Sequence, residues 1–296
     1  MTYTEHAVLF PCDECTLIGI VTAPRLPSEI AVVVIVGGPQ YRAGSHRQFV
    51  LLARRLAEAS YPVIRFDCRG MGDSSGVPCS FESTSADIAA AIDAVRQQVP
   101  QARRIVLWGL CDGASAALLY VHETGDERVC GMCLANPWVR SELSLARTHV
   151  KHYYTRRLMQ REFWSKLFRG RIGNEALAAV VRSFLIALRG RPSGTASRAQ
   201  FQQRMVAGWR RLQGSVLLLL SGEDYTAKEF AEYAAAEPSW MEVLSSPRLT
   251  RGDLPAADHT FSRSTDRRRA EDLTLAWLAT LRRVEDAAPK GSSQHR

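Results

Sequence analysis

A cysteine framed by glycines is the residue of this chain best placed to do chemistry. Residues 109–113 read Gly-Leu-Cys-Asp-Gly, after an apolar run at 104–108 and before a small-residue helix predicted at 112–121. A strand, G-x-C-x-G and a helix form the pattern of a nucleophile elbow, with cysteine where serine is usual. The glycines permit a strained turn and a close approach of helix and strand. We therefore predict that Cys111 is a nucleophile, its thiolate favoured by the helix N-terminus; the alternative is a structural thiol in a tight turn.

A thiolate nucleophile needs a proton shuttle, and two residues late in the chain are placed to provide it. Folds with a nucleophile elbow bring the nucleophile, the acid and the histidine in that order along the chain. Asp224 follows an apolar run at 215–220, and His259 follows a predicted last strand at 248–254. We predict that His259 is the base and that Asp224 fixes its tautomer. Asp258 is the lesser candidate for the acid, because adjacent side chains diverge.

The developing oxyanion needs two donors. The N–H of Asp112, at the start of the predicted helix, is the first. The second should come from the turn after the strand at 31–36, but that turn contains Pro39, which has no N–H. We expect the backbone of Gln40 to donate instead; otherwise the hole is incomplete. The residues expected to contact the substrate are Gly38, Arg42 and His46.

Strand and helix signals alternate along the first 138 residues and again after 213. Short apolar runs predict strands at 31–36, 62–66, 104–108, 129–135 and 215–220. Amphipathic periodicity predicts helices at 46–60, 83–99, 112–121 and 266–281. This alternation is typical of an α/β fold with a mostly parallel central sheet and helices on both faces.

The middle of the chain departs from that alternation and carries most of the positive charge. The chain has a formal net charge of +8, yet residues 140–211 hold sixteen Lys and Arg against three Asp and Glu. We predict a core at 1–138, a basic helical cap inserted at 139–212, a second core part at 213–286 and a flexible tail at 287–296. The cap would cover the site, or receive an anionic partner or membrane surface.

No cofactor or metal ion is expected. Cys130 and Cys133 have the C-x-x-C spacing of a zinc site, but they lie in a predicted strand whose successive side chains alternate between faces. Seven cysteines, an odd number, argue against a disulfide framework. The sequence shows neither a signal peptide nor an apolar run of transmembrane length, so we expect a cytoplasmic protein without a transmembrane segment. Nucleic-acid binding is not expected, because no recognised motif accompanies the charge.

Four motifs carry a resemblance to a known group. They are GGPQYR at 37–42, RFDCRGMGDS at 65–74, GLCD at 109–112 and ADHTF at 257–261. With them the chain resembles an α/β-hydrolase over nearly its whole length, and more narrowly the exosortase A system-associated hydrolases of type 1. The resemblance implies a setting in exopolysaccharide production and protein sorting. It also implies that the glycine-rich stretch at 65–74 is a loop bordering the active site rather than a phosphate-binding loop.

These observations predict a hydrolase that cleaves an ester or thioester through an acyl-enzyme on Cys111. The predicted carriers of a thioester-linked acyl group are coenzyme A or an acyl carrier protein docked on the basic cap. Two alternatives stay open. The same intermediate would make the protein an acyltransferase if a sugar hydroxyl replaced water. A non-catalytic scaffold retaining the elbow is the other, and Pro39 is its best argument.

Overall fold

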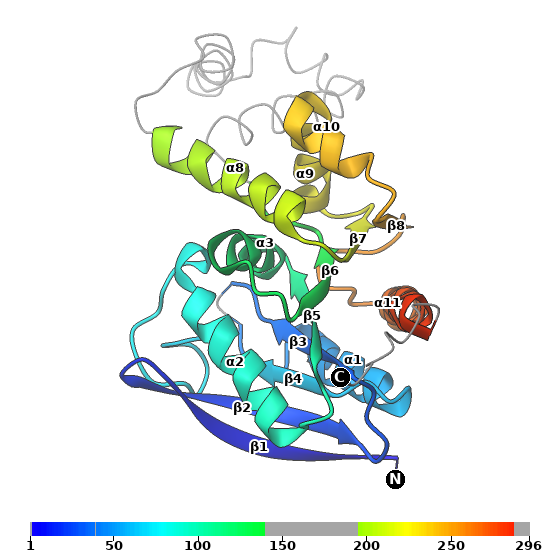
Figure 1. Cartoon of the computed structure of the whole chain (residues 1–296). Helices are drawn as coiled ribbons and strands as arrows, with labels where there is room; N and C mark the ends of the chain where they lie inside the picture. The colour runs from blue at the N-terminus through cyan, green and yellow to red at the C-terminus, as the bar shows by residue number, and fades with distance from the viewer. Residues whose placement is uncertain (1, 39, 140–194, 287–296) are drawn as a thin grey trace, which may run out of the picture.

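The computed structural model describes residues 2–38, 40–139 and 195–286 and has an α/β architecture (Figure 1). Eight strands form one sheet in the order β1-β2-β4-β3-β5-β6-β7-β8. Strands β3 to β8 are parallel, and β2 joins β4 antiparallel. The predicted α/β class with a mostly parallel sheet is confirmed.

The strands expected from apolar runs are all present, because a strand covered on both faces must be apolar throughout. They are β3 (Ile30–Ile35), β4 (Val63–Phe66), β5 (Arg104–Leu110), β6 (Val129–Ala135) and β7 (Ser215–Ser221). The last strand is β8 (Leu249–Leu254). The sequence did not predict the edge hairpin of β1 (Tyr3–Cys12) and β2 (Cys15–Pro24). Side chains of β1 alternate between buried and exposed over much of its length, a weaker signal than a continuous apolar run.

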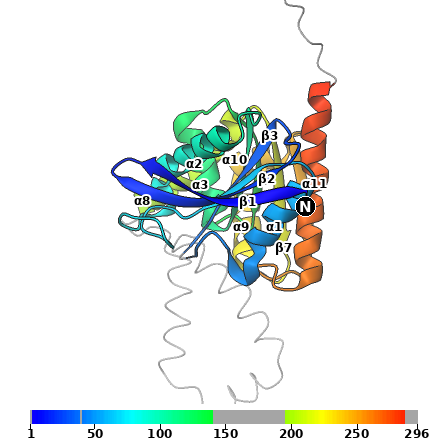
Figure 2. The same cartoon turned by 90° about the horizontal axis from the view of Figure 1, so that it is seen from below.

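Helices cover both faces of the sheet (Figure 2). The longer ones are α1 (Gln48–Glu58), α2 (Ser85–Gln98), α3 (Asp112–Thr124), α8 (Thr195–Arg211), α9 (Tyr225–Ala236) and α11 (Ser264–Asp286). The shorter ones are α10 (Pro238–Leu244) and two 3-10 turns, η1 (Ser45–Arg47) and η2 (Phe81–Ser83). Side chains of α2, α3, α8 and α9 join one hydrophobic cluster, and those of α1 and α11 join a second. In the described part of the chain, no helix combines the length and apolarity needed to cross a membrane.

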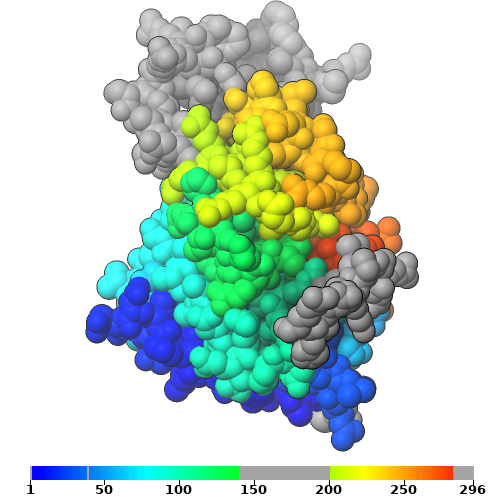
Figure 3. Space-filling view, in the orientation of Figure 1, coloured from blue at the N-terminus to red at the C-terminus, as the bar shows by residue number. Residues whose placement is uncertain are grey.

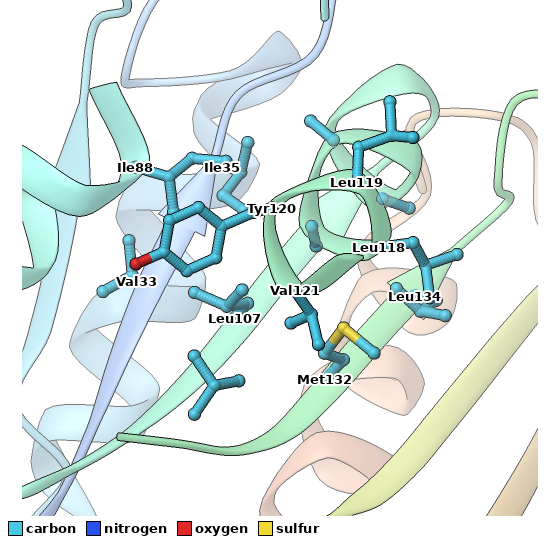
Figure 4. Packing of buried hydrophobic residues seen from close by; sticks show 14 of the residues in the cluster. Val33, Ile35, Ile88, Leu107, Leu118, Leu119, Tyr120, Val121, Met132 and Leu134 are labelled. Atoms are coloured by element: carbon cyan, nitrogen blue, oxygen red, sulfur yellow. The ribbon is translucent and has the colours of Figure 1, made fainter. Parts of the chain in front are cut away.

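The two clusters meet at the central strands, whose side chains alternate between them. On the first face, Tyr120 of α3 lies over Val33 and Leu107, and Val121 lies beside Met132 of β6 (Figure 4). In the second cluster, Phe49 of α1 and Trp277 of α11 pack with aliphatic side chains of the strands. Burial from both sides fixes β5 and α3, the two elements that flank Cys111, against the rest of the core.

One detail of the sequence argument about zinc is wrong. Cys130 and Cys133 do not alternate simply between faces, because a β-bulge shifts the β5–β6 register so that Ile105 pairs with Val129 and Val106 with Gly131. Both thiols therefore pack against the same hydrophobic cluster, the one formed with α1 and α11. Within the described residues, no group of three or more His, Cys, Asp and Glu side chains is arranged to hold a metal ion.

The final helix of the predicted basic insertion packs directly on the core. Helix α8 lies along α3 (Figures 1 and 3), and its Met205, Val206 and Trp209 are buried. Gly208 allows this approach, since a Cβ there would collide with the carbonyl group of Leu118. Residues 140–194 of the predicted cap lie outside the described part of the chain.

The Gly208→Ala variant tests this contact. Alanine at an unobstructed helix position stabilises a protein by about 0.4–1 kcal/mol. Here the added methyl group meets backbone, so we expect the free energy of unfolding, measured by urea denaturation, to fall by about 1–3 kcal/mol. Gln203→Ala, at an exposed position of the same helix, is the matched control and should change it by less than about 0.5 kcal/mol. A stabilising Gly208→Ala would show that the two helices are not in this close contact.

Candidate active site

Cys111 occupies a strained turn between β5 and α3. It has φ 61° and ψ −125°, a backbone conformation that residues with a side chain rarely adopt. Its N–H donates to the carbonyl of Ala135 (2.9 Å), and its carbonyl accepts from the N–H groups of Ala114 (3.1 Å) and Trp138 (3.2 Å). These bonds hold the turn, so the half-buried thiol stands at the N-terminus of α3.

The two glycines of the motif are required by space as well as by the turn. A Cβ on Gly109 would overlap the backbone of Gly113, and a Cβ on Gly113 would overlap the carbonyl of Ile35 in β3. The helix therefore starts in contact with two strands. The backbone at 109–113 has the strand–turn–helix geometry that the sequence predicted for a nucleophile elbow.

His259 and Asp224 approach each other from the loops after β8 and β7. The Nδ1 atom of His259 lies 2.8 Å from Oδ2 of Asp224. Asp224 is buried and also begins α9, where its carboxylate accepts the N–H groups of Thr226 (3.0 Å) and Ala227 (3.2 Å). The His259 ring is also hydrogen-bonded to the side chain of Cys111.

The surroundings of His259 favour its charged form. Its hydrogen bonds to Asp224 and to Cys111, opposed by burial, raise the pKa of His259 to about 10. These contacts favour the imidazolium, which is placed between a carboxylate and a sulfur atom. This arrangement suits a thiolate–imidazolium pair.

Asn136, which the sequence analysis did not single out, braces the histidine loop. It is fully buried at the end of β6. Its side-chain Nδ2 donates to Oγ of Ser221 (3.0 Å) and to the carbonyl of His259 (3.4 Å), and its Oδ1 accepts the N–H of Ser221 (2.9 Å). A lone polar residue directly after a fully apolar strand was the available signal.

A cavity of about 420 Å³ opens above the thiol. Cys111, Asp112 and His259 line it together with Gly37, Gly38 and Gln40 of the loop at 37–40, called the oxyanion loop below. Most of the remaining wall is apolar, formed by Phe49, Phe81, Leu110 and Trp138. A second cavity of about 260 Å³, bordered by Met71 and Cys79, shares Gly37, Gly38, Phe81 and Asp112 with the first.

Two backbone donors of the oxyanion loop, those of Gly38 and Gln40, are already engaged. Gly38 N–H donates to Oδ2 of Asp112 (2.9 Å), and Gln40 N–H donates to the carbonyl of Gly38 (2.8 Å). Burial raises the pKa of the Asp112 carboxyl, and the N–H groups of Gly38, Asp112 and Gly113 oppose that rise. The expected backbone donor at Gln40 is thus bonded within its own loop, and Pro39 lies outside the described residues.

Two residues expected to contact substrate do not line either cavity. The guanidinium of Arg42 is paired with the carboxylates of Asp67 and Asp73, and its N–H donates to Asp67 Oδ1 (2.6 Å). Arg42 therefore ties the oxyanion loop to the 67–74 loop. His46 is exposed, with φ 52°, in the turn before α1. Gly38 does line both cavities.

This fold and this site define an α/β-hydrolase enzyme. The family model of serine aminopeptidase, S33, matches residues 27–237, well over half of the chain, and the chain belongs to that family. The match includes Cys111 and Asp224 and ends before His259. No curated protein sequence matches the chain.

Solved structures share the fold at low identity. A Pyrococcus furiosus esterase is 14% identical with a TM-score of 0.63, over 94% of this chain and 91% of that one. A thermostable carboxyl esterase from Bacillus coagulans is 14% identical with a TM-score of 0.61, over 95% and 99%. Proline iminopeptidase from Mycobacterium smegmatis is 15% identical with a TM-score of 0.59, over 93% and 100%.

The pH dependence of stability tests the His259–Asp224 contact. A histidine whose pKa rises from about 6.5 on folding stabilises the protein fully below pH ~6.5, and this contribution is lost as the pH rises through about 10. Asp224→Asn removes the carboxylate charge. We expect the difference in unfolding free energy between wild type and variant to be largest near pH ~6 and to shrink towards pH ~10.5.

The matched control is Asp253→Asn. This exposed carboxylate at the end of β8 pairs with Arg251, which keeps its charge over that range. Its effect on the unfolding free energy should be nearly constant with pH. An equally constant difference for Asp224→Asn would contradict the charged His259 described above.

Proposed function

We propose that this hydrolase cleaves esters or thioesters through an acyl-enzyme on Cys111, with His259 as the proton shuttle and Asp224 as its orienting acid. One observation carries the proposal: His259 is hydrogen-bonded to Asp224 on one side and to Cys111 on the other, at the wall of a cavity. A buried structural thiol needs neither partner. Cysteine here stands at the elbow of a family named for serine.

The acylation step follows from these contacts. The Cys111 thiolate attacks the carbonyl carbon, and the carbonyl π electrons move to oxygen, giving a tetrahedral oxyanion. When the oxyanion collapses, the bond to the leaving alcohol or thiol breaks, and His259 gives that group its proton. The acyl group is left as a thioester on Cys111, while neutral His259 keeps its hydrogen bond to Asp224.

Deacylation regenerates the site with the same residues. Neutral His259 takes a proton from water as the water oxygen attacks the acyl carbon, and the thiolate departs. A sugar hydroxyl in place of water would give an acyltransferase by the same steps. Hydrolysis is favoured here because the family is one of hydrolases, and the esterases among the structural neighbours support an ester substrate.

The cavity wall favours an apolar acyl group. Phe49, Phe81 and Trp138 present aromatic surface beside the thiol, and Leu110 adds aliphatic surface. An acyl chain gains from contact with such a surface about 0.8 kcal/mol per buried methylene group. The polar residues of the cavity are Gln40, Cys111, Asp112 and His259, and a carbonyl group would lie beside them.

Docking of coenzyme A or an acyl carrier protein on the basic block would depend on residues 140–194. The described arginines at its C-terminal end are already engaged: Arg204 pairs with Glu82 and Glu123, Arg210 pairs with Glu242, and Arg211 donates to the carbonyl of His122. We also propose a cytoplasmic location and, from the resemblance carried by the four sequence motifs, an exosortase-associated setting in exopolysaccharide production.

Intact-protein mass spectrometry tests the proposed chemistry. The wild type is exposed briefly to a panel of activated esters and acyl thioesters, beside Cys111→Ala and His259→Ala. We expect an increase in mass equal to one acyl group on the wild type and none on Cys111→Ala. On His259→Ala the adduct should persist, because no base activates water for deacylation.

Cys79→Ala is the matched control, since Cys79 is a second half-buried cysteine and borders the neighbouring cavity. This variant should be acylated like the wild type. An adduct that survives in Cys111→Ala would exclude Cys111 as the nucleophile. No adduct from any donor, in protein shown to be folded, would favour the scaffold alternative.

A further inference from the structure

Proline at position 39 and existing hydrogen bonds limit the backbone donors that the 37–40 loop offers to an oxyanion. Position 39 is proline and has no N–H to give. The neighbouring N–H groups of Gly38 and Gln40 donate to Asp112 and to the Gly38 carbonyl. A side-chain donor would therefore add to the stabilisation of a carbonyl oxygen that gains negative charge beside Cys111.

The side chain of Gln40 is in the right place. It lines the same cavity as Cys111 and His259. Its Oε1 atom accepts the N–H of Ser45 (3.3 Å) and lies 3.4 Å from Ser45 Oγ. Within the described residues, its Nε2 atom has no hydrogen-bond partner.

The contact with Ser45 also assigns the oxygen and nitrogen positions of the Gln40 side-chain amide. A backbone N–H can only donate, so the atom that accepts from Ser45 must be the oxygen. The NH₂ group is then the other end of the amide, away from Ser45 and unbonded. The loop thus keeps an oriented, neutral donor at the wall of the cavity.

We propose that the Nε2–H of Gln40 donates to the substrate carbonyl oxygen as it becomes an oxyanion, replacing the backbone N–H that Pro39 lacks. This inference rests on the proposed function. A donor held in place before the reaction needs no reorganisation when charge develops, and one such side-chain donor contributes a factor of about 10²–10³ to kcat in enzymes that use one. Gln40 would complete the hole with the Asp112 N–H.

Single-turnover acylation of full-length protein by a chromogenic activated ester tests the role. Gln40→Met keeps similar volume without a donor, and Gln40→Glu keeps the acceptor for Ser45 but replaces the donor by a negative charge. We expect both to lower the acylation rate constant at saturating ester at least about 100-fold, while the half-saturating ester concentration changes only a few-fold. Tyr41→Phe, at the exposed neighbouring position, is the control and should acylate like the wild type.

Alkylation of Cys111 by iodoacetamide forms no oxyanion. It therefore separates a role of Gln40 in stabilising the oxyanion from an effect of Gln40 on the thiol or on the loop. Gln40→Met should alkylate at Cys111 as fast as the wild type. If alkylation slows as much as acylation, Gln40 acts on the thiol or the loop, and the proposal is overturned. It is also overturned if only the half-saturating ester concentration rises, or if the variants acylate at the wild-type rate. A wild type that alkylates but never acylates overturns the proposed function together with this one.

Discussion

The close contact between the start of α3 and the ends of β3 and β5 determines the rest of the site. Cys111 adopts a positive φ there, which costs of the order of 1–3 kcal/mol for a residue with a side chain. Three glycines make the contact feasible, since a Cβ on Gly37, Gly109 or Gly113 would overlap backbone atoms. The buried packing of α3 between α2 and α8 opposes the strain. The turn thus presents the thiol at a helix N-terminus, where negative charge is favoured.

The remaining polar groups reach the thiol because the parallel strands end at one edge of the sheet. The loop after β7 carries Asp224 and the loop after β8 carries His259, and β7 lies between β6 and β8 in the sheet. Asn136, after β6, ties these two loops together through Ser221 and the His259 carbonyl. A single fully buried amide thus couples the position of the histidine to the sheet. Such buried polar groups are stable only when every donor and acceptor is paired.

The oxyanion loop is organised by buried charge. The Asp67 carboxylate, fully buried, accepts the Arg42 N–H, pairs with the Arg42 guanidinium and accepts the Asp73 N–H. Removing one partner of such a buried pair leaves an uncompensated charge and is costly. A second carboxylate, Asp112, holds Gly38 from the opposite side. The loop is therefore fixed by its neighbours, and the side-chain amide of Gln40 is its donor without a partner among the described residues.

The sequence by itself determined the features that depend on neighbouring residues. Apolar runs located β3 to β7, because strands buried on both faces must be apolar throughout. The glycines beside Cys111 predicted the turn. The order of nucleophile, acid and histidine along the chain pointed to Asp224 and His259, each of which follows a later strand. Local pattern failed where pairing partners are distant. The β1–β2 hairpin has a less regular alternation, and the bulge beside Cys130 depends on the register with β5.

Only the tertiary structure decided how the polar groups are shared. Arg42 lies four residues from Gly38 and was expected at the substrate, yet it pairs with Asp67, 25 residues away. The Gln40 N–H was expected to be free, yet the turn of its own loop uses it. A donor or acceptor bonds whichever group the fold brings within about 3 Å, and sequence spacing does not reveal those distances. Residue types therefore show which chemistry is available, and the packing of distant segments determines which atoms remain free to perform it.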